Sequence, residues 1–98
     1  MTEIRQTAEF AKWLKALRDI RAKAKVLVRI ERLADGNSGN VKAVGGGVSE
    51  LKIDFGPGYR VYFANRGEAL IILLTGGDKD SQADDVKKAK RILSELED

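Results

Sequence analysis

The apolar positions in the first third of the chain repeat with the period of an α-helix. Thr7 and Asp19 are each suited to cap a helix, and each is followed by a one-sided apolar stripe. The first stripe is Phe10, Trp13, Leu14 and Leu17, and the second is Val26, Ile30 and Leu33. Gly36 suits a left-handed C-cap. The pattern predicts two helices joined by a tight turn, after a short edge strand over residues 1–5.

After Gly36 the pattern changes to the alternation and short apolar runs of β-strands, separated by glycine-rich turns. It predicts strands over residues 41–44, 50–55, 59–64 and 69–74. A last apolar stripe at helical spacing, behind Asp84 and Asp85, predicts a terminal helix. The order β-α-α-β-β-β-β-α indicates an α+β fold with a mainly antiparallel sheet, packed against the helices on one face. We expect the other face to meet solvent or a partner.

Composition narrows the chemistry that the chain can perform. Ninety-eight residues suit one domain over 1–98, and the absence of cysteine and histidine excludes disulfides, thiolate or imidazole metal sites and histidine-based catalysis. No apolar run approaches the roughly 18 residues that span a bilayer, and residues 1–13 are too charged for a signal-peptide core. We therefore expect a soluble cytoplasmic protein in which any chemistry must use Lys, Arg, Asp, Glu or Tyr.

The hairpin around Gly56-Pro57-Gly58 is the most informative segment. A three-residue loop pairs Phe55 with Tyr59, Asp54 with Arg60 and Lys52 with Tyr62. One face of the hairpin then turns apolar side chains to the core. The opposite, solvent-facing side carries Glu50, Lys52, Asp54, Arg60 and Tyr62, and the end of the last strand brings Lys79 to its rim. This side is either a solvated surface with an Asp54–Arg60 ion pair or a cluster of two cations and a tyrosine that binds a phosphate.

The net charge of +3 is unevenly distributed, since residues 1–35 hold nine of the 18 basic side chains and only five of the 15 acidic ones. Four of these cations recur on one side of the second predicted helix: Arg21, Lys25, Arg29 and Arg32. They form either a solvated helix surface or a row of phosphate contacts to a long nucleic acid.

Two further groups have simpler explanations. Gly45-Gly46-Gly47 leads into a strand rather than a helix, so it predicts a tight turn and not a phosphate-binding loop. Asp78, Asp80, Asp84 and Asp85 flank a helix start, where acidic side chains cap the helix and oppose its dipole. We favour that explanation over a site for a hard metal ion.

Three blocks carry a resemblance to a known family. They are GNVKAV (39–44), VSELKIDFGPGYRVYF (48–63) and LLTGGDKDSQ (73–82). The chain resembles the RelE/ParE/HigB toxin superfamily, in particular the branch of phage Gp49-like or HigB-like addiction module killer proteins. The resemblance covers nearly the whole chain. It implies a RelE-like fold and the toxin of a bacterial type II toxin–antitoxin system.

The resemblance also implies an activity and its partners. RelE-like toxins are mRNA interferases, endoribonucleases that cut messenger RNA on the ribosome without a metal, by attack of a ribose 2′-hydroxyl on the adjacent phosphate. A helix-turn-helix antitoxin neutralises the toxin, and operator DNA is reached only through the toxin–antitoxin complex. No membrane is involved.

By position, Lys52, Arg60 and Lys79 match the catalytic cations of the RelE pattern. They would accept the 2′-proton, hold the pentacoordinate phosphate and assist the leaving 5′-oxygen, in an order that can be permuted. Glu50 is an alternative base, and Tyr62 shares their face. Asp54 stands where RelE-type enzymes have a second lysine, and no tyrosine follows Tyr62 to match the terminal tyrosine of RelE.

Two other functions remain open at this point. A ParE-like toxin would inhibit DNA gyrase by binding alone, and a non-catalytic module would only bind the antitoxin and regulate its operon. The three cations favour the nuclease.

Overall fold

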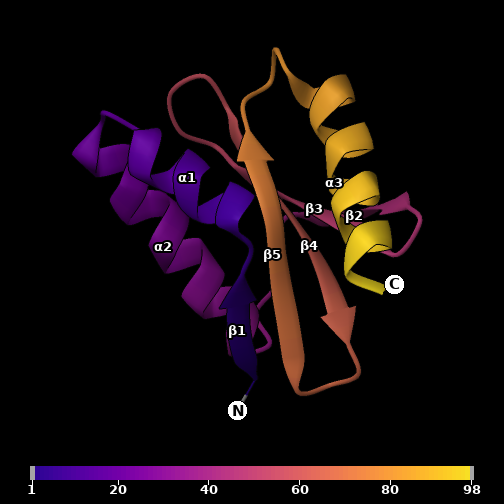
Figure 1. Cartoon of the computed structure of the whole chain (residues 1–98). Coiled ribbons are helices and arrows are strands. Elements are labelled where there is room, and N and C mark those ends of the chain that lie inside the picture. The colour runs from indigo at the N-terminus through magenta and orange to yellow at the C-terminus, as the bar shows by residue number, and fades with distance from the viewer. Residues whose placement is uncertain (1, 98) are drawn as a thin grey trace.

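The computed structural model describes residues 2–97 and places a five-stranded sheet between two helical layers (Figure 1). The elements in chain order are β1 (Glu3–Gln6), α1 (Ala8–Ala16), α2 (Ile20–Ala34), β2 (Val41–Gly45), β3 (Val48–Ile53), β4 (Tyr59–Arg66), β5 (Leu70–Gly77) and α3 (Gln82–Glu97). In the sheet the strands lie in the order β1-β5-β4-β3-β2. Edge strand β1 runs parallel to β5 and the other neighbours are antiparallel, which confirms the predicted α+β fold.

The predicted helix boundaries are confirmed by their caps. Thr7 Oγ1 accepts a hydrogen bond from the amide of Phe10 at 3.1 Å, and Asp19 Oδ1 accepts one from the amide of Arg21 at 2.9 Å. Gly36 ends α2 with a φ of 89°, a conformation that glycine adopts without strain. Both helices therefore begin and end where local backbone chemistry favours it.

The helical hairpin of α1 and α2 covers one face of the sheet. Phe10 from α1 and Val26, Ile30 and Leu33 from α2 are buried against alternate strand side chains. Those strand residues are Leu51, Ile53, Val61, Phe63, Ile71 and Leu73. The predicted apolar face of the β3–β4 hairpin is therefore confirmed as core.

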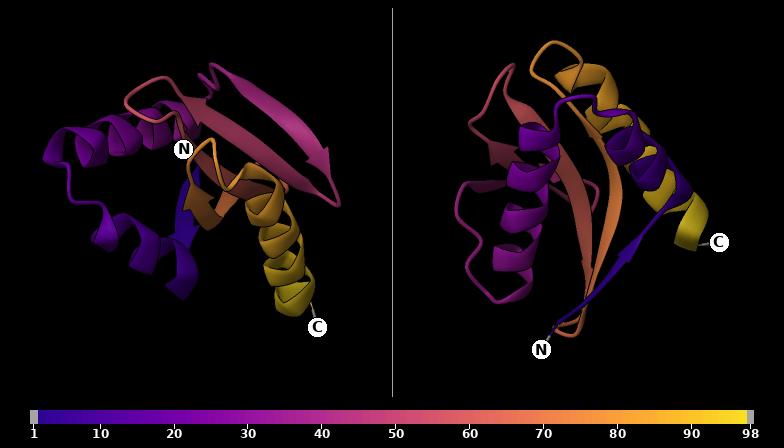
Figure 2. Two further views of the ribbon diagram at one scale, coloured as in Figure 1. Left: turned by 90° about the horizontal axis from the view of Figure 1, so that it is seen from above. Right: turned by 90° about the vertical axis from the view of Figure 1, so that its left-hand side faces the viewer.

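The expectation that helices cover only one face of the sheet is wrong. Helix α3 packs on the opposite face, as the two views of Figure 2 show. Its Ala89, Ile92 and Leu93 are buried in a second apolar cluster, and the strand residues of that cluster are Val48, Tyr62, Ala64 and Leu74. The sequence did not reveal this face because its apolar side chains on β3 and β4, Val48, Tyr62 and Ala64, share it with the charged side chains of Glu50, Lys52 and Arg60.

The predicted hairpin register is also wrong, by two residues. The connection spans residues 54–58, with Gly56 at φ 57° and Gly58 at φ 81°, so Ile53 pairs with Tyr59 and Lys52 with Arg60. A shift of two preserves the faces, because side chains alternate with a period of two. It changes every cross-strand partner, which decides the geometry of the site described below.

None of the helices within residues 2–97 combines the length and the apolar content that crossing a lipid bilayer requires.

Candidate functional site

A hollow of about 320 Å³ opens on the sheet face that α3 only partly covers. It is lined by Asn40, Lys42, Glu50, Lys52, Arg60 and Gln82. The strand register places these side chains in two adjacent rows. One row holds Lys42 opposite Glu50, and the next holds Lys52 opposite Arg60. Three cations and one carboxylate therefore share a small concave surface.

Arg60 is held from two directions. Its Nη1 donates to the carbonyl oxygen of Gly58 at 2.9 Å, and its Nε lies 3.4 Å from Oε1 of Glu50. Only 6% of Arg60 and 3% of Glu50 are exposed. The other carboxylate oxygen of Glu50 accepts a hydrogen bond from Nε2 of Gln82 at 3.0 Å. A guanidinium fixed in this way presents its charge to the hollow without having to be ordered first.

The sequence predicted Arg60 in a different setting, on a solvent-exposed face and paired with Asp54. Both parts are wrong: the two-residue shift in register places Lys52 instead of Asp54 opposite Arg60, and α3 packs on the face that was expected to meet solvent. The arginine pairs with buried Glu50 instead.

Lys52 and Asp54 form the second ion pair of this region, with Nζ 3.6 Å from Oδ1. Both side chains have substantial solvent exposure, so the pair is weak and its partners can separate. The amide of Lys52 donates to the carbonyl oxygen of Asn40 at 3.0 Å, which fixes its backbone. Lys52 thus offers a movable ammonium group beside a fixed guanidinium.

Lys79 lies just beyond β5, exposed and beside the hairpin loop. A methyl group added to Gly58 would be 3.6 Å from Nη1 of Arg60 and 3.7 Å from Cβ of Lys79. The base of the Lys79 side chain therefore lies beside Gly58 and close to Arg60, although Lys79 does not line the hollow.

Tyr62 lies on the same face but is fully buried under α3, where the sequence predicted it to face solvent. Its hydroxyl makes no hydrogen bond to any residue within 2–97. Burial above all raises the pKa of this phenol, the carboxylates of Glu50 and Asp85 raise it further, and Arg60 opposes them. Tyr62 does not line the hollow.

Three lining residues were not singled out from the sequence. Lys42 and Asn40 belong to the block 39–44. Lys42 pairs with Glu50 across β2 and β3, so the two side chains lie on the same face of the sheet, and this pairing is the signal that identifies Lys42. Gln82 enters the site from the first turn of α3. It belongs to the block 73–82, but nothing in the pattern placed it in the site, because α3 was not expected on this face.

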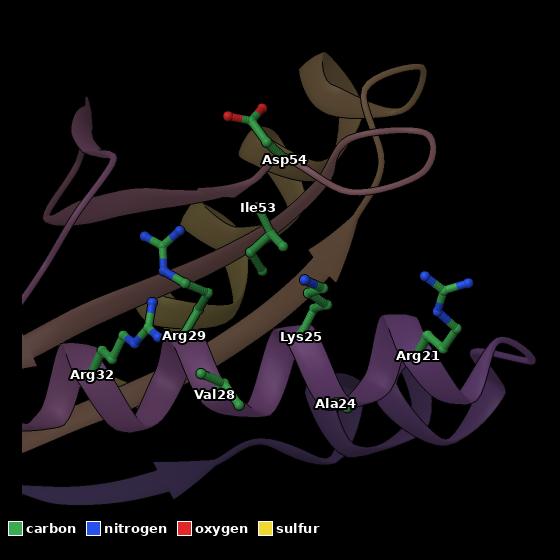
Figure 3. A pocket seen from close by; sticks show the side chains of 8 residues that line it. All are labelled: Arg21, Ala24, Lys25, Val28, Arg29, Arg32, Ile53 and Asp54. Atoms are coloured by element: carbon green, nitrogen blue, oxygen red, sulfur yellow. The ribbon is translucent and has the colours of Figure 1, made fainter.

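The four predicted cations of α2 line a separate and larger groove, of about 620 Å³, between α2 and the end of β3 (Figure 3). Its lining is Arg21, Ala24, Lys25, Val28, Arg29, Arg32, Ile53 and Asp54.

Not all of these cations face solvent freely. Arg29 donates to the carbonyl oxygens of Lys52 and Ser38, both at 3.3 Å, and so ties α2 to β3. Arg21 and Lys25 each lie 5.6 Å from the centre of the Phe55 ring. Arg29 therefore serves the fold, while Arg21, Lys25 and Arg32 are exposed.

The aspartates around the start of α3 have local roles, and Asp78 closes the turn before the helix. Asp78 Oδ1 accepts hydrogen bonds from the amides of Asp80 and Ser81 at 3.0 and 3.1 Å, and Asp84 and Asp85 lie in the first helical turn. Within residues 2–97 no three acidic side chains are grouped so that they could hold a metal ion.

The chain matches a known protein family and a curated relative. The family described as "Phage derived protein Gp49-like (DUF891)" matches residues 12–97. A protein of Haemophilus influenzae strain Rd, titled "Uncharacterized protein", is 50% identical over 94 residues, which cover 96% of this chain and 95% of the relative. The range matched by the family includes every residue of both the hollow and the α2 groove.

Proposed function

Since the chain belongs to the phage-derived Gp49-like family, a HigB/RelE-like family of addiction module toxins, we propose that it is a toxin that cleaves messenger RNA on the ribosome. Its partners in this proposal are a helix-turn-helix antitoxin and ribosome-bound messenger RNA, and it meets operator DNA only within the antitoxin complex. The protein acts in the cytoplasm, without a membrane, metal or cofactor.

The observation that carries the proposal is the group of cations around the hollow. Lys42, Lys52 and Arg60 line it, and the Cβ of Lys79 lies beside Gly58, next to Arg60. A phosphodiester matches this chemistry, because a fixed guanidinium binds two phosphate oxygens at once and ammonium groups act as mobile point charges. The volume of about 320 Å³ accommodates a phosphate and part of its ribose.

The reaction that fits these side chains is transfer of the phosphoryl group to the neighbouring 2′-hydroxyl. The 2′-oxygen forms a bond to phosphorus as the bond to the 5′-oxygen breaks, which leaves a 2′,3′-cyclic phosphate and a 5′-hydroxyl. Arg60 stabilises the charge that develops on the phosphorane oxygens. In its neutral form Lys52 accepts the 2′-proton, and Lys79 delivers a proton to the leaving 5′-oxygen.

Glu50 takes a different role in this scheme. One of its oxygens faces Arg60 and the other accepts from Gln82, and the residue is 3% exposed. We therefore assign Glu50 as a positioning residue for Arg60 rather than as the general base.

The test is induction of the protein in growing cells, followed by mapping of new 5′ ends on messenger RNA. Wild type should produce 5′-hydroxyl ends inside coding regions within minutes. Lys52→Gln should remove them, because glutamine has similar reach but accepts no proton. Lys12→Gln on the opposite side of the sheet is the matched control and should cut as wild type does.

Two results would replace the proposal. Intact messenger RNA together with a loss of DNA supercoiling would identify a gyrase inhibitor. Intact messenger RNA and unaffected replication, with retained antitoxin binding, would identify a module that only binds.

A further inference from the structure

Helix α2 exposes an apolar stripe that no element within residues 2–97 covers. Ile20 is 80% exposed, Leu27 47% and Val28 44%, and Ala24 between them is exposed as well. At about 100° per residue, these four side chains fall within an arc of about 100° on the helix, opposite its buried face. Contiguous exposed aliphatic side chains of this kind are typical of a surface that binds another protein.

The stripe is bordered by the basic side chains of the α2 groove. Arg21, Lys25 and Arg32 rise along its edge toward β3 (Figure 3), while Ala24, Val28 and Ile53 supply apolar lining. Asp54 is the one carboxylate in that lining. The surface therefore combines an apolar stripe with a positive rim.

This combination fits an acidic amphipathic helix better than it fits RNA. A row of phosphate contacts needs the cations but gains nothing from exposed isoleucine, leucine and valine. The aromatic ring of the region, Phe55, already lies against Arg21 and Lys25. From residue 20 to residue 28 the stripe extends about 12 Å, which is two turns of a partner helix. Apolar anchors at this spacing with carboxylates beside them would match both parts of the surface.

We propose that the α2 groove, defined by its eight lining residues, and the adjoining stripe of Ile20, Leu27 and Val28 bind an acidic amphipathic helix of the antitoxin. The inference rests on the proposed function only in taking the antitoxin as the partner. The stripe lies on the helical-hairpin side of the sheet, whereas the hollow around Arg60 lies on the α3 side. Antitoxin binding and RNA cleavage should therefore be separable by substitution.

The experiment measures binding of the helix-turn-helix antitoxin of the proposed function, by calorimetric titration into the purified toxin. Leu27→Asp places a carboxylate in the middle of the apolar stripe, where it opposes an acidic partner. The matched control is Leu96→Asp, which changes an equally exposed leucine on α3. We expect Leu27→Asp to bind at least about 30-fold more weakly while it melts and cleaves as wild type does, and the control to match wild type throughout.

A second variant tests the charges. Arg21→Glu combined with Lys25→Glu should weaken antitoxin binding to a similar extent and make it less dependent on salt. Replacing Arg21, Lys25 and Arg32 by glutamine should leave the salt dependence of ribosome binding unchanged. If instead the glutamine variant gives a shallower ribosome salt slope and full antitoxin affinity, the groove binds RNA and the inference is overturned.

The remaining outcomes separate this inference from the proposed nuclease. Binding within threefold of wild type for Leu27→Asp, or no binding by wild type, would overturn the docking surface even if messenger RNA is cut. Conversely, a wild type that cuts no messenger RNA but needs Leu27 for antitoxin binding would remove the nuclease and support the docking surface.

Discussion

Nε of Arg60 lies 3.4 Å from Oε1 of Glu50, and both side chains are almost completely buried between the sheet and α3. A buried ion pair of this kind is costly to break, because removal of one partner leaves the other charge without compensation. The same pair orients the guanidinium toward the hollow. Tests of Arg60 must therefore separate loss of chemistry from loss of folding.

Arg60→Lys is the informative substitution at this position. Lysine keeps the charge opposite Glu50 but loses the planar fork that binds two phosphate oxygens. We expect messenger RNA cleavage in a translation extract to fall by about 100-fold. Thermal melting should stay close to that of wild type.

Arg91→Lys, an exposed arginine on α3, is the matched control and should cleave normally. Full cleavage by Arg60→Lys would show that a point charge suffices and that the fork takes no part.

The cost of breaking the buried pair can be measured directly. Glu50→Leu should destabilise the protein by about 3–5 kcal/mol in urea unfolding, because it leaves the Arg60 charge unpaired. The double variant Glu50→Leu with Arg60→Met should recover much of that loss but no cleavage. If the single variant is as stable as the double one, the pair carries no buried charge penalty.

Tyr62→Phe should cleave messenger RNA at the wild-type rate, since the phenol lies beneath the hollow and not in it. Stability at neutral pH should be equal or higher, because the buried hydroxyl has no hydrogen-bond partner within residues 2–97. Melting curves and a cleavage assay test both expectations. Lost cleavage in a stable Tyr62→Phe protein would show that the Tyr62 hydroxyl takes part in the reaction.

The same variant gives a pH dependence with a definite sign. Burial raises the pKa of Tyr62 above its usual value of 10, so the neutral phenol favours the folded state. This contribution is fully present below pH 10 and is lost as the pH rises toward the folded pKa. Wild type should lose up to about 1.4 kcal/mol per pH unit above 10 relative to Tyr62→Phe in urea unfolding. Parallel curves for the two proteins would contradict the shift.

The sequence predicted the elements well because local chemistry fixes them. Thr7, Asp19 and Gly36 mark helix ends through contacts within a few residues, and Gly56 and Gly58 mark the hairpin through their backbone angles. The hairpin register failed because a loop of three residues and one of five share the same glycines. Side-chain parity is identical in both, so the apolar pattern gives no means of choosing between them.

The site was predicted in its residues but not in its environment. Lys52 and Arg60 do line the same hollow, since their side chains stay on one face of the hairpin in either register, and the Cβ of Lys79 lies beside Gly58 near Arg60. Whether Arg60 is exposed depends on where α3 packs. At the end of β5, Gly77 leaves room for Ser81 and Asp85 at the start of α3, because a side chain at this position would collide with both. No hydrophobic periodicity reveals this close approach.

Asp54 stands where the RelE pattern has a lysine. Its Oδ1 lies 3.6 Å from Nζ of Lys52, so it both holds the ammonium group and repels an approaching phosphate. Asp54→Asn should therefore raise kcat/KM for cleavage by about threefold to tenfold at low salt, with the gain shrinking as salt screens the charge. Folding should be unaffected, because exposed pairs contribute only about 0–1 kcal/mol.

Glu68→Gln, in the β4–β5 turn at the opposite end of the strands, is the matched control. It removes the same charge away from Lys52 and should give no gain. Unchanged or lower cleavage by Asp54→Asn would mean that this carboxylate assists Lys52 instead of restraining it.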